Sequence, residues 1–425
     1  MASKVSTSPA ANRAAAEAIV RTLRDAGHIA YFAGGCVRDE LLGLAPTDYD
    51  VATDAVPERL AALFPRTSHV GASFGVVLVM MGHEVVEVAT FRADGTYSDN
   101  RRPDRVTFSD PLADAQRRDF TVNALFLDPL DEAGTPGSPV RGRVIDHVGG
   151  LADLAERRLR AVGDADRRLA EDHLRALRAV RLAARLGFTI EAATGEAIGR
   201  HASELRGVSR ERIGDEVRRM MAHASRAAAA MLLRDLGLEA PVLEMKVSLA
   251  ARTPATLASL PGETPVPTAL AAWALDLGHD PASTPDAVNA LATKWRQALC
   301  LSNDERTAFQ GALLSLRALS MDWEGAAVAR QKRLAAADGF PAALILLDAV
   351  DPTRAAQIRG RVRVLEGIAG GIRPVPLISG DDLQALGLRP GPGFRPILEQ
   401  VYDAQLEGRV TSAEEARELA RRLGV

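Results

Sequence analysis

The chain has 425 residues, of which 47% are hydrophobic and 25% are charged, and its formal net charge is −3. These proportions are ordinary for globular proteins, and the length predicts more than one domain. So small a net charge excludes a polycation, so any nucleic acid would have to bind to local clusters of arginine. Aromatic residues make up only 4% of the chain, which argues against an extended base-stacking surface.

The cysteines and the apolar stretches limit the compartment in which we expect the protein. Its two cysteines, Cys36 and Cys300, are too few for a disulfide framework or a four-cysteine metal site. The first twenty residues lack the uninterrupted apolar segment of a signal peptide, and no run of about 18 apolar residues occurs. We therefore expect a soluble, cytoplasmic protein with no membrane contact.

The predicted elements divide the chain into an α+β part and a helical part. Helical spacing is found over residues 13–26 and stops at Gly27; short β-like runs then alternate with a few helices up to Gly150. From Leu151 onward strand patterns disappear and helical patterns replace them. Residues 248–270, rich in Pro and Thr, are interpreted as a loop or linker, and Gly and Pro in residues 370–383 indicate a further boundary. The expected segments are a head with a small mixed sheet (1–150) and all-α neck (151–225), body (226–345) and tail (346–425).

A glycine pair, Gly34-Gly35, follows an apolar strand and precedes a helix-like segment that contains Arg38. Such a turn can present backbone amides and a helix N-terminus to an anion, with the arginine one turn further on. By itself the pair is more typical of an ordinary turn. Its position just ahead of two aspartates favours a phosphate site.

Asp48 and Asp50 are separated by one residue in an extended segment, so both side chains should leave the same face of a sheet. Two carboxylates held close together repel each other unless a divalent cation lies between them. Mg²⁺ prefers carboxylate and phosphate oxygens, so this pattern predicts a metal–nucleotide site. Glu87, in an apolar run, is the favoured third acid, with Glu84 as the alternative. Three carboxylates could hold two ions about 4 Å apart.

Two further segments contain residues that suit a nucleotide. Arg117, Arg118 and Asp119 precede a strand, where an arginine and a carboxylate can bind a triphosphate and a ribose hydroxyl; a surface ion pair is the alternative.

The second segment is predicted as one helix with a charged stripe of residues three apart, Asp172, Arg175, Arg178 and Arg181. A solvated helix face is the ordinary explanation of such a stripe. However, a carboxylate and an arginine complement the amino donor and ring-nitrogen acceptor that C and A share. Asp172 and Arg175 could thus select C or A without a template, because mismatched polar groups discriminate strongly.

Together these motifs resemble the bacterial tRNA nucleotidyltransferase/poly(A) polymerase family, and specifically its class II CCA-adding members. The segments "GGCVRDELLG", "PTDYDVAT", "GASFGVVLV", "EVATFRADGTYSDNRRPDRVTF", "RRDFTVNAL", "IDHVGGLADL" and "EDHLRALRAVRLAARLGF" occur in the family's order. The resemblance is nearly continuous over residues 31–188 and becomes weaker beyond, where "SRERIGDEV" and "GDDLQALGLRPGPGFRPIL" are also similar.

The resemblance implies a nucleotidyltransferase that uses Mg²⁺, CTP and ATP and binds the acceptor end of tRNA. Asp48 and Asp50 would be the metal ligands and Glu87 the third catalytic acid. The incoming nucleotide would be bound by Gly34, Gly35, Arg38 and Arg118 at the triphosphate, Asp119 at the ribose, Asp172 and Arg175 at the base, and Arg178 and Arg181 at the base or phosphates.

Several alternatives remain open at this point. Residues 91–106 resemble the flexible loop needed to switch from C to A, which argues against an enzyme that adds only CC, and "GASFGVVLV" stands where poly(A)-making relatives have a "GRRF"-like segment. An enzyme that adds only the terminal A, a poly(A) polymerase, a small-molecule nucleotidyltransferase and a non-catalytic RNA-binding protein are the other candidates. His279-Asp280 is interpreted as a helix end rather than part of a phosphohydrolase site. The sequence does not indicate an oligomeric state.

Overall fold

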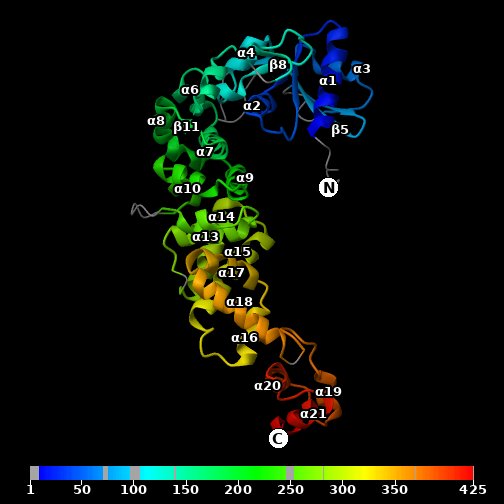
Figure 1. Ribbon diagram of the computed structural model, residues 1–425, viewed down its shortest axis with the longest axis vertical. Helices are drawn as coiled ribbons and strands as arrows, with labels where there is room; N and C mark the ends of the chain where they lie inside the picture. Colours follow the sequence, from blue (N-terminus) through cyan, green and yellow to red (C-terminus); the bar gives the residue numbers. More distant parts are fainter. Residues whose placement is uncertain are drawn as a thin grey trace. The chain divides into compact units, whose positions relative to one another are not determined.

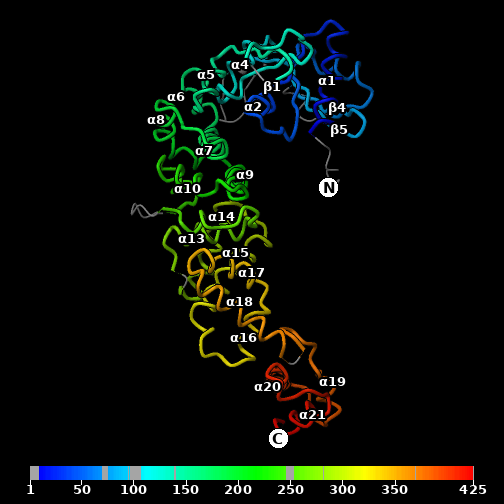
Figure 2. The backbone as a smooth tube through the Cα atoms, viewed as in Figure 1, coloured from blue at the N-terminus to red at the C-terminus, as the bar shows by residue number. Residues whose placement is uncertain are grey.

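The computed structural model describes residues 9–69, 75–95, 106–137, 140–245, 253–280, 282–368 and 370–424. The chain forms two compact units, one of residues 1–209 and 232–241 and the other of residues 210–231 and 242–425. Figures 1 and 2 trace the chain through both. This division is coarser than the four predicted segments, whose boundaries stay predictions.

The first unit begins with the sheet and the helices around it. Its first elements are α1 (Pro9–Asp25), β1 (Ala30–Ala33), α2 (Gly35–Leu41), β2 (Asp50–Thr53), α3 (Pro57–Leu63), β3 (Thr67–His69), β4 (Val76–Met81), β5 (Glu84–Thr90), β6 (Arg92–Asp94), β7 (Val106–Phe108), α4 (Pro111–Gln116), the 3₁₀ helix η2 (Thr121–Asn123), β8 (Phe126–Asp128) and β9 (Arg143–Ile145). It continues with α5 (Gly150–Ala155), β10 (Arg158–Leu159), α6 (Ala165–Glu171), α7 (Arg175–Leu186), β11 (Thr189–Ile190), α8 (Ala192–His201) and the 3₁₀ helix η3 (Ala202–Gly207).

The main sheet has seven strands in the order β3-β4-β5-β2-β1-β8-β9. All neighbouring strands are antiparallel except β2 and β5, which are parallel. A parallel pair needs a crossover, and α3, β3 and β4 supply it. The predicted mixed sheet in an α+β head is therefore confirmed.

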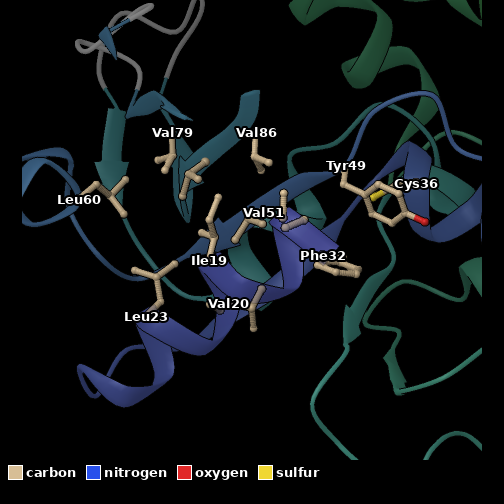
Figure 3. Packing of buried hydrophobic residues seen from close by; sticks show 14 of the residues in the cluster. Ile19, Val20, Leu23, Phe32, Cys36, Tyr49, Val51, Leu60, Val79 and Val86 are labelled. Atoms are coloured by element: carbon tan, nitrogen blue, oxygen red, sulfur yellow. The ribbon is translucent and has the colours of Figure 1, made fainter. Parts of the chain in front are cut away.

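Helix α1 packs over β1, β2 and β5 and buries its apolar side against one face of the sheet. Ile19, Val20 and Leu23 are fully buried there together with Val51 and Val88; Figure 3 shows these three α1 side chains directed at the sheet. Burial of such side chains stabilises a fold by roughly 1.5–3 kcal/mol each. Because α1 covers this face, only the opposite face of β1, β2 and β5 can carry the side chains of a binding site.

The opposite face of the sheet is only partly covered. A second, smaller core forms there around Ala33, Ala52, Phe91 and Phe126, where the Phe91 and Phe126 rings meet edge to face with centroids 5.8 Å apart. Toward the start of β2 this face is open, because Asp50 is exposed.

The neck contains a short pair of strands that the sequence did not indicate. β10 and β11 pair in parallel over two residues each, with Arg158 opposite Thr189 and Leu159 opposite Ile190. Segments this short give no periodic signal. The prediction that strands end at Gly150 is therefore wrong at this one place.

The second unit is helical throughout its described residues. Its helices are α9 (Arg210–Met221), α10 (Arg226–Asp235), α11 (Glu239–Leu243), α12 (Ala255–Ser259), α13 (Val266–Asp276), α14 (Pro285–Leu299), α15 (Asn303–Met321), α16 (Val328–Ala335), α17 (Phe340–Val350), α18 (Pro352–Glu366), α19 (Gly380–Ala385), α20 (Phe394–Leu406) and α21 (Ala413–Leu423). Parts of α10 and α11 belong to the first unit. No helix in the described ranges is long and apolar enough to cross a membrane.

The predicted linker over residues 248–270 is partly wrong. Residues 246–252 lie outside the described part of the chain, but α12 and the start of α13 fall within the segment. The buried Asp276 carboxylate accepts hydrogen bonds from the backbone amides of Thr256 and Leu257, each at 2.9 Å. Pro265 caps α13 and so begins a helix, as proline can at a helix N-terminus.

Candidate active site

Asp50 and Glu87 lie opposite each other on neighbouring strands of the sheet. Asp50 is the first residue of β2 and pairs with Glu87 in the parallel ladder between β2 and β5. Both residues are exposed, whereas Val51 and Val88, the next pair in this ladder, are buried under α1. Because side chains alternate across a strand, both carboxylates leave the face opposite to α1.

The same alternation separates the other two acids considered. Asp48 lies just before β2 and is exposed, while Tyr49 is buried with its ring 5.2 Å from that of Phe32. Asp48 therefore shares the open face with Asp50. Glu84 begins β5 three residues before Glu87, so it belongs to the other face of the strand.

Burial and the neighbouring carboxylates change the ionisation of Asp50. Loss of hydration by the surrounding protein atoms, followed by the negative charges of Glu87 and Asp48, raises the pKa of Asp50 to about 6, against the opposing influence of Arg118. Loss of hydration also raises the pKa of Glu87. The site therefore concentrates negative charge that a cation would neutralise.

The three acids fit a divalent cation by their donor chemistry, since hard cations bind carboxylate oxygens. Among the described residues, however, the oxygens of Asp48, Asp50 and Glu87 do not all lie within 4.8 Å of one another. A bound cation would attract all three carboxylates. The predicted metal ligands therefore lie on one face without forming a closed cage.

The glycine pair forms a tight turn between β1 and α2. Gly34 has φ +78° and precedes the first residue of α2, and its amide donates to the Leu125 carbonyl at 3.0 Å. Arg38 lies beneath this turn: its buried guanidinium bonds the Asp39 carboxylate at 2.6 and 2.8 Å and the side chain of Asn123. The Arg38 guanidinium, which was predicted to bind the triphosphate, is therefore already held beneath the glycine turn by Asp39 and Asn123.

Gly34→Ala should lower both stability and nucleotide binding. A Cβ at Gly34 would lie 2.9 Å from Nη1 of Arg118, and a side chain at this positive φ costs about 1–3 kcal/mol. We expect a fall in unfolding free energy of that size and roughly tenfold weaker binding of the triphosphate, because Arg118 must move. Calorimetric titration with CTP and thermal unfolding measure the two effects.

Gly27→Ala is the matched control for this substitution. Gly27 also has a positive φ, +84°, but nothing in the described part of the chain lies within 4 Å of the point that its Cβ would occupy. This variant should lose stability through backbone strain alone and bind CTP normally. Equal CTP affinity in the Gly34→Ala protein would contradict a role for Arg118 at the triphosphate.

Arg118 is held in place by a residue that the sequence did not single out. Its guanidinium bonds the buried Asp114 carboxylate at 3.0 and 3.1 Å, donates to the Asn123 carbonyl at 3.2 Å and lies 5.1 Å from the centroid of the Phe126 ring. Arg117 bonds the other oxygen of the same carboxylate. Burial opposes ionisation of Asp114, but the two arginines outweigh it and lower its pKa.

Asp119 and Arg178 form an ion pair between the head loop and α7. The Arg178 guanidinium donates to Oδ2 of Asp119 at 2.6 and 2.8 Å, while Oδ1 accepts from the Phe120 amide at 2.8 Å and from the Asn123 side chain at 3.2 Å. Burial opposes ionisation of Asp119, yet Arg178 and, to a smaller extent, the Asn123 side chain and the charge of Arg175 lower its pKa to about 2. Two residues predicted to bind different parts of the nucleotide therefore bind each other.

The predicted continuous helix with a stripe from Asp172 to Arg181 is wrong at its start. Helix α6 ends at Glu171 and α7 begins at Arg175. The Asp172 side chain accepts a hydrogen bond from the Leu174 amide at 3.1 Å, and such an Asx turn competes with helix. Asp172 thus lies in the turn between the helices, and only Arg175, Arg178 and Arg181 lie on α7.

Arg175 also has a fixed partner. Its Nη1 donates to Oε2 of Glu171 and to the Arg168 carbonyl, both at 2.6 Å, and the same Glu171 oxygen accepts from Arg168 at 2.6 Å. Asp172 and Arg175, the predicted base readers, are linked through their backbones, because the Arg175 amide donates a hydrogen bond to the Asp172 carbonyl at 3.0 Å.

Two family models match parts of the chain. A family model described as the poly A polymerase head domain matches residues 30–160, and one described as a probable RNA and SrmB-binding site of polymerase A matches residues 187–246. These two segments are therefore similar to the head and RNA-binding domains of the tRNA nucleotidyltransferase/poly(A) polymerase family. Members of this family use divalent metal ions.

Curated relatives in this family are named CCA-adding enzymes. The protein from Geobacillus kaustophilus is 43% identical over 234 residues, which are 54% of this chain and 55% of the relative. The protein from Streptococcus pyogenes (serotype M2) is 47% identical over 195 residues, 46% of each chain. The matched segment spans about half the length of these relatives.

Solved structures of the family match nearly the whole chain. The Bacillus stearothermophilus CCA-adding enzyme in complex with CTP has a TM-score of 0.76 at 27% identity, covering 98% of both chains. The Thermotoga maritima CCA-adding enzyme complexed with tRNA has a TM-score of 0.69 at 18% identity, covering 98% of this chain and 96% of the other. The second likeness shows the fold alone.

Parts of the family pattern lie outside the described residues. Residues 71–74, within "GASFGVVLV", and residues 96–105, within the predicted flexible loop, are not described; β6 and β7, which adjoin this loop, pair as a hairpin. His279 and Asp280 follow the end of α13 in a turn, where the His279 amide donates to the Ala274 carbonyl at 3.0 Å. This agrees with the interpretation as a helix end.

Proposed function

We propose that this protein adds CCA to the 3′ ends of tRNA without a template, using CTP and ATP and releasing pyrophosphate. The observation that supports this most is the pairing of Asp50 with Glu87 on the open face of the sheet, beside the glycine turn. A protein that binds no metal would gain nothing from placing these charges together. We place the enzyme in the cytoplasm, where tRNA and both nucleotides are available.

Asp48 and Asp50 would hold Mg²⁺, with Glu87 as the third catalytic acid. The bound ion would supply Lewis acidity to the attacking 3′-hydroxyl and to the departing pyrophosphate. The protein itself would orient the nucleotide: the backbone at Gly34 and Gly35, with Arg118, lies where the triphosphate would bind. These assignments agree with the raised pKa of Asp50, which indicates a carboxylate awaiting a counter-charge.

Base choice would depend on Asp172 and Arg175, although they are arranged differently from the predicted helix stripe. The turn after α6 holds the Asp172 carboxylate, and Glu171 holds the Arg175 guanidinium at 2.6 Å. Two polar groups fixed in this way can accept the edge shared by C and A and leave U and G with mismatched groups. Asp119, Arg178 and Arg181 would contact the ribose, base or phosphates from beside them.

Arg175→Ala should impair selection more than RNA binding. We expect the preference for CTP and ATP over UTP and GTP to fall about 10²-fold, since a site that hydrogen-bonds its substrate discriminates by at least that amount. Single-turnover rates with each nucleotide measure the preference, and filter binding measures tRNA affinity.

Arg167→Ala is the control, because Arg167 lies on α6 and approaches the same Glu171 at 3.8 Å but is 82% exposed. It should discriminate as the unaltered protein does. If Arg175→Ala also selects CTP and ATP normally, the assignment of Asp172 and Arg175 as base readers is wrong.

The activity is tested on three tRNA transcripts that end before CCA, after the first C and after CC. Purified protein, Mg²⁺, labelled CTP and ATP are supplied, and products are resolved to single nucleotides. Completion of CCA on the first transcript followed by a halt supports the proposal. Extension of only the CC-ended transcript would identify an A-adding enzyme, and a long ladder of A would identify a poly(A) polymerase. Absence of metal-dependent nucleotide binding would favour a non-catalytic RNA-binding protein.

A further inference from the structure

Two histidines and a glutamate converge in the neck, on elements separate from the acids of the sheet. His173 lies in the turn between α6 and α7, His201 is the last residue of α8, and Glu204 lies in η3. One ligand atom from each lies within 4.8 Å of the other two. All three belong to the first unit.

We propose that His173, His201 and Glu204 form a binding site for a transition-metal dication of the Zn²⁺ class. Oε2 of Glu204 lies 3.1 Å from Nδ1 of His173 and 2.8 Å from Nδ1 of His201. In a tetrahedral zinc site with bonds of about 2.0–2.2 Å, ligand atoms lie about 3.3 Å apart. Both contacts of Glu204 are shorter than this spacing, so its carboxylate would move outward from the two nitrogens to admit the ion.

The state of His173 is the second observation that supports a ligand. The residue is 7% exposed, and its Nδ1 is a buried nitrogen with no hydrogen-bond partner in the described part of the chain, because the approach of Glu204 lacks hydrogen-bond geometry. Buried polar atoms rarely remain unsatisfied. A metal ion between the two groups would give this nitrogen a partner.

The surroundings of His201 have the arrangement that supports a metal-bound histidine. Its Nε2 lies 3.2 Å from Oδ1 of Asp166, and Arg200 fixes that aspartate through two bonds of 2.7 and 3.1 Å. A histidine that binds metal commonly donates its other ring N–H to a carboxylate, which orients the ring. Glu204 is 46% exposed, so water could complete the coordination.

This choice of ion follows from the donor set. Two imidazoles and one carboxylate suit Zn²⁺, Co²⁺ or Ni²⁺ better than Mg²⁺, which prefers oxygen alone. The neck site would therefore take a different ion from the one proposed for the sheet. Bound metal would join the turn that holds Asp172 and His173 to the end of α8.

The test is a titration of the full-length chain, first freed of metal with a chelator, with Co²⁺ followed by its visible absorption. The protein carries Asp50→Asn to weaken binding at the sheet, so the result is independent of the proposed activity. We expect one equivalent with the absorption of tetrahedral Co²⁺ bound to imidazole. Glu204→Gln should weaken binding about 100-fold, and Asp166→Asn about 10–100-fold.

Glu196→Gln is the matched control, because Glu196 lies on α8 near Arg200 but outside the cluster, and it should bind Co²⁺ with unchanged affinity. Thermal unfolding of each variant shows whether it is folded; Glu204→Gln, at an exposed side chain, should be. The proposal is overturned if no equivalent binds in the Asp50→Asn protein, or if Glu204→Gln and His201→Ala bind as tightly as the control. The cluster would then be a metal-free ion pair between histidine and glutamate.

Discussion

Asp50→Asn is expected to lower the rate of nucleotide addition by about 10³-fold or more. Asn keeps the size of the side chain but loses the charge that would bind the metal, and a bound metal contributes several kcal/mol to a transition state, with each 1.4 kcal/mol worth tenfold. Single-turnover addition of C to a tRNA transcript measures the loss. Residual activity within tenfold of the unaltered protein would contradict Asp50 as a metal ligand.

The same substitution should stabilise the metal-free protein at neutral pH. A carboxyl whose pKa in the fold is raised from 3.8 to about 6 contributes stability below about pH 4 and loses it as the pH rises through 6. Asn has no such dependence. We therefore expect the variant to unfold at a higher temperature than the unaltered protein at pH 7, by a few degrees at most, and at the same temperature near pH 4.

That stability comparison separates a lost charge from a damaged fold. Val51→Ala in the same strand is the control, because it removes buried volume under α1 and should lower the unfolding temperature at every pH. A fall in stability of Asp50→Asn at pH 7 would mean that the carboxylate is satisfied by protein groups and does not await a cation.

Arg178→Met is expected to destabilise the first unit by about 2–3 kcal/mol, somewhat less than for a fully buried pair, since Arg178 is partly exposed. It leaves the buried Asp119 charge without its main partner. Because the pKa of Asp119 is lowered to about 2, its contribution is present above about pH 4 and lost as the pH falls toward 2. The difference between variant and unaltered protein should therefore shrink in acid.

The measurement must report on the correct unit. All three tryptophans, Trp273, Trp295 and Trp323, belong to the second unit, so tryptophan fluorescence would miss the change. Hydrogen exchange of the β8 and α7 amides reports the first unit directly. Arg185→Met is the control, because this arginine lies on the same helix and approaches Asp39 only to 3.9 Å. Adding Asp119→Asn to Arg178→Met should recover part of the loss; no recovery would contradict the ion pair as its cause.

Much of the sheet and the position of its acids could be predicted because they depend on local alternation. Buried Tyr49 and Val51 alternate with exposed Asp48 and Asp50, and Val86 and Val88 flank Glu87 in the same way. Alternation of polar and apolar residues along a strand shows which residues lie on its buried face and which lie on its exposed face, and it can be recognised without the tertiary structure. The mixed sheet and the helical remainder followed from the same kind of pattern.

The groups that hold the candidate site together could not be predicted in this way. Asp114, Asn123 and Glu171 bind arginines assigned to the nucleotide, and only the fold decides which acid meets which arginine. Asp114 is followed by adjacent arginines three and four residues on, a spacing that predicts contact on a helix, so a signal existed there. The break at Asp172 was missed because its turn occupies only three residues within an apolar helical pattern.

The parallel ladder between β2 and β5 has a consequence for changes of chain length. Extra residues in the crossover between α3 and β3 would lengthen a connection without altering which residues of the ladder face each other, and loop closure changes slowly with length. Loss of one residue of β5 ahead of Glu87 would instead slip the rest of the strand by one position, and each of the shifted side chains would change face. Glu87 would then be turned under α1, and a valine would stand beside Asp50.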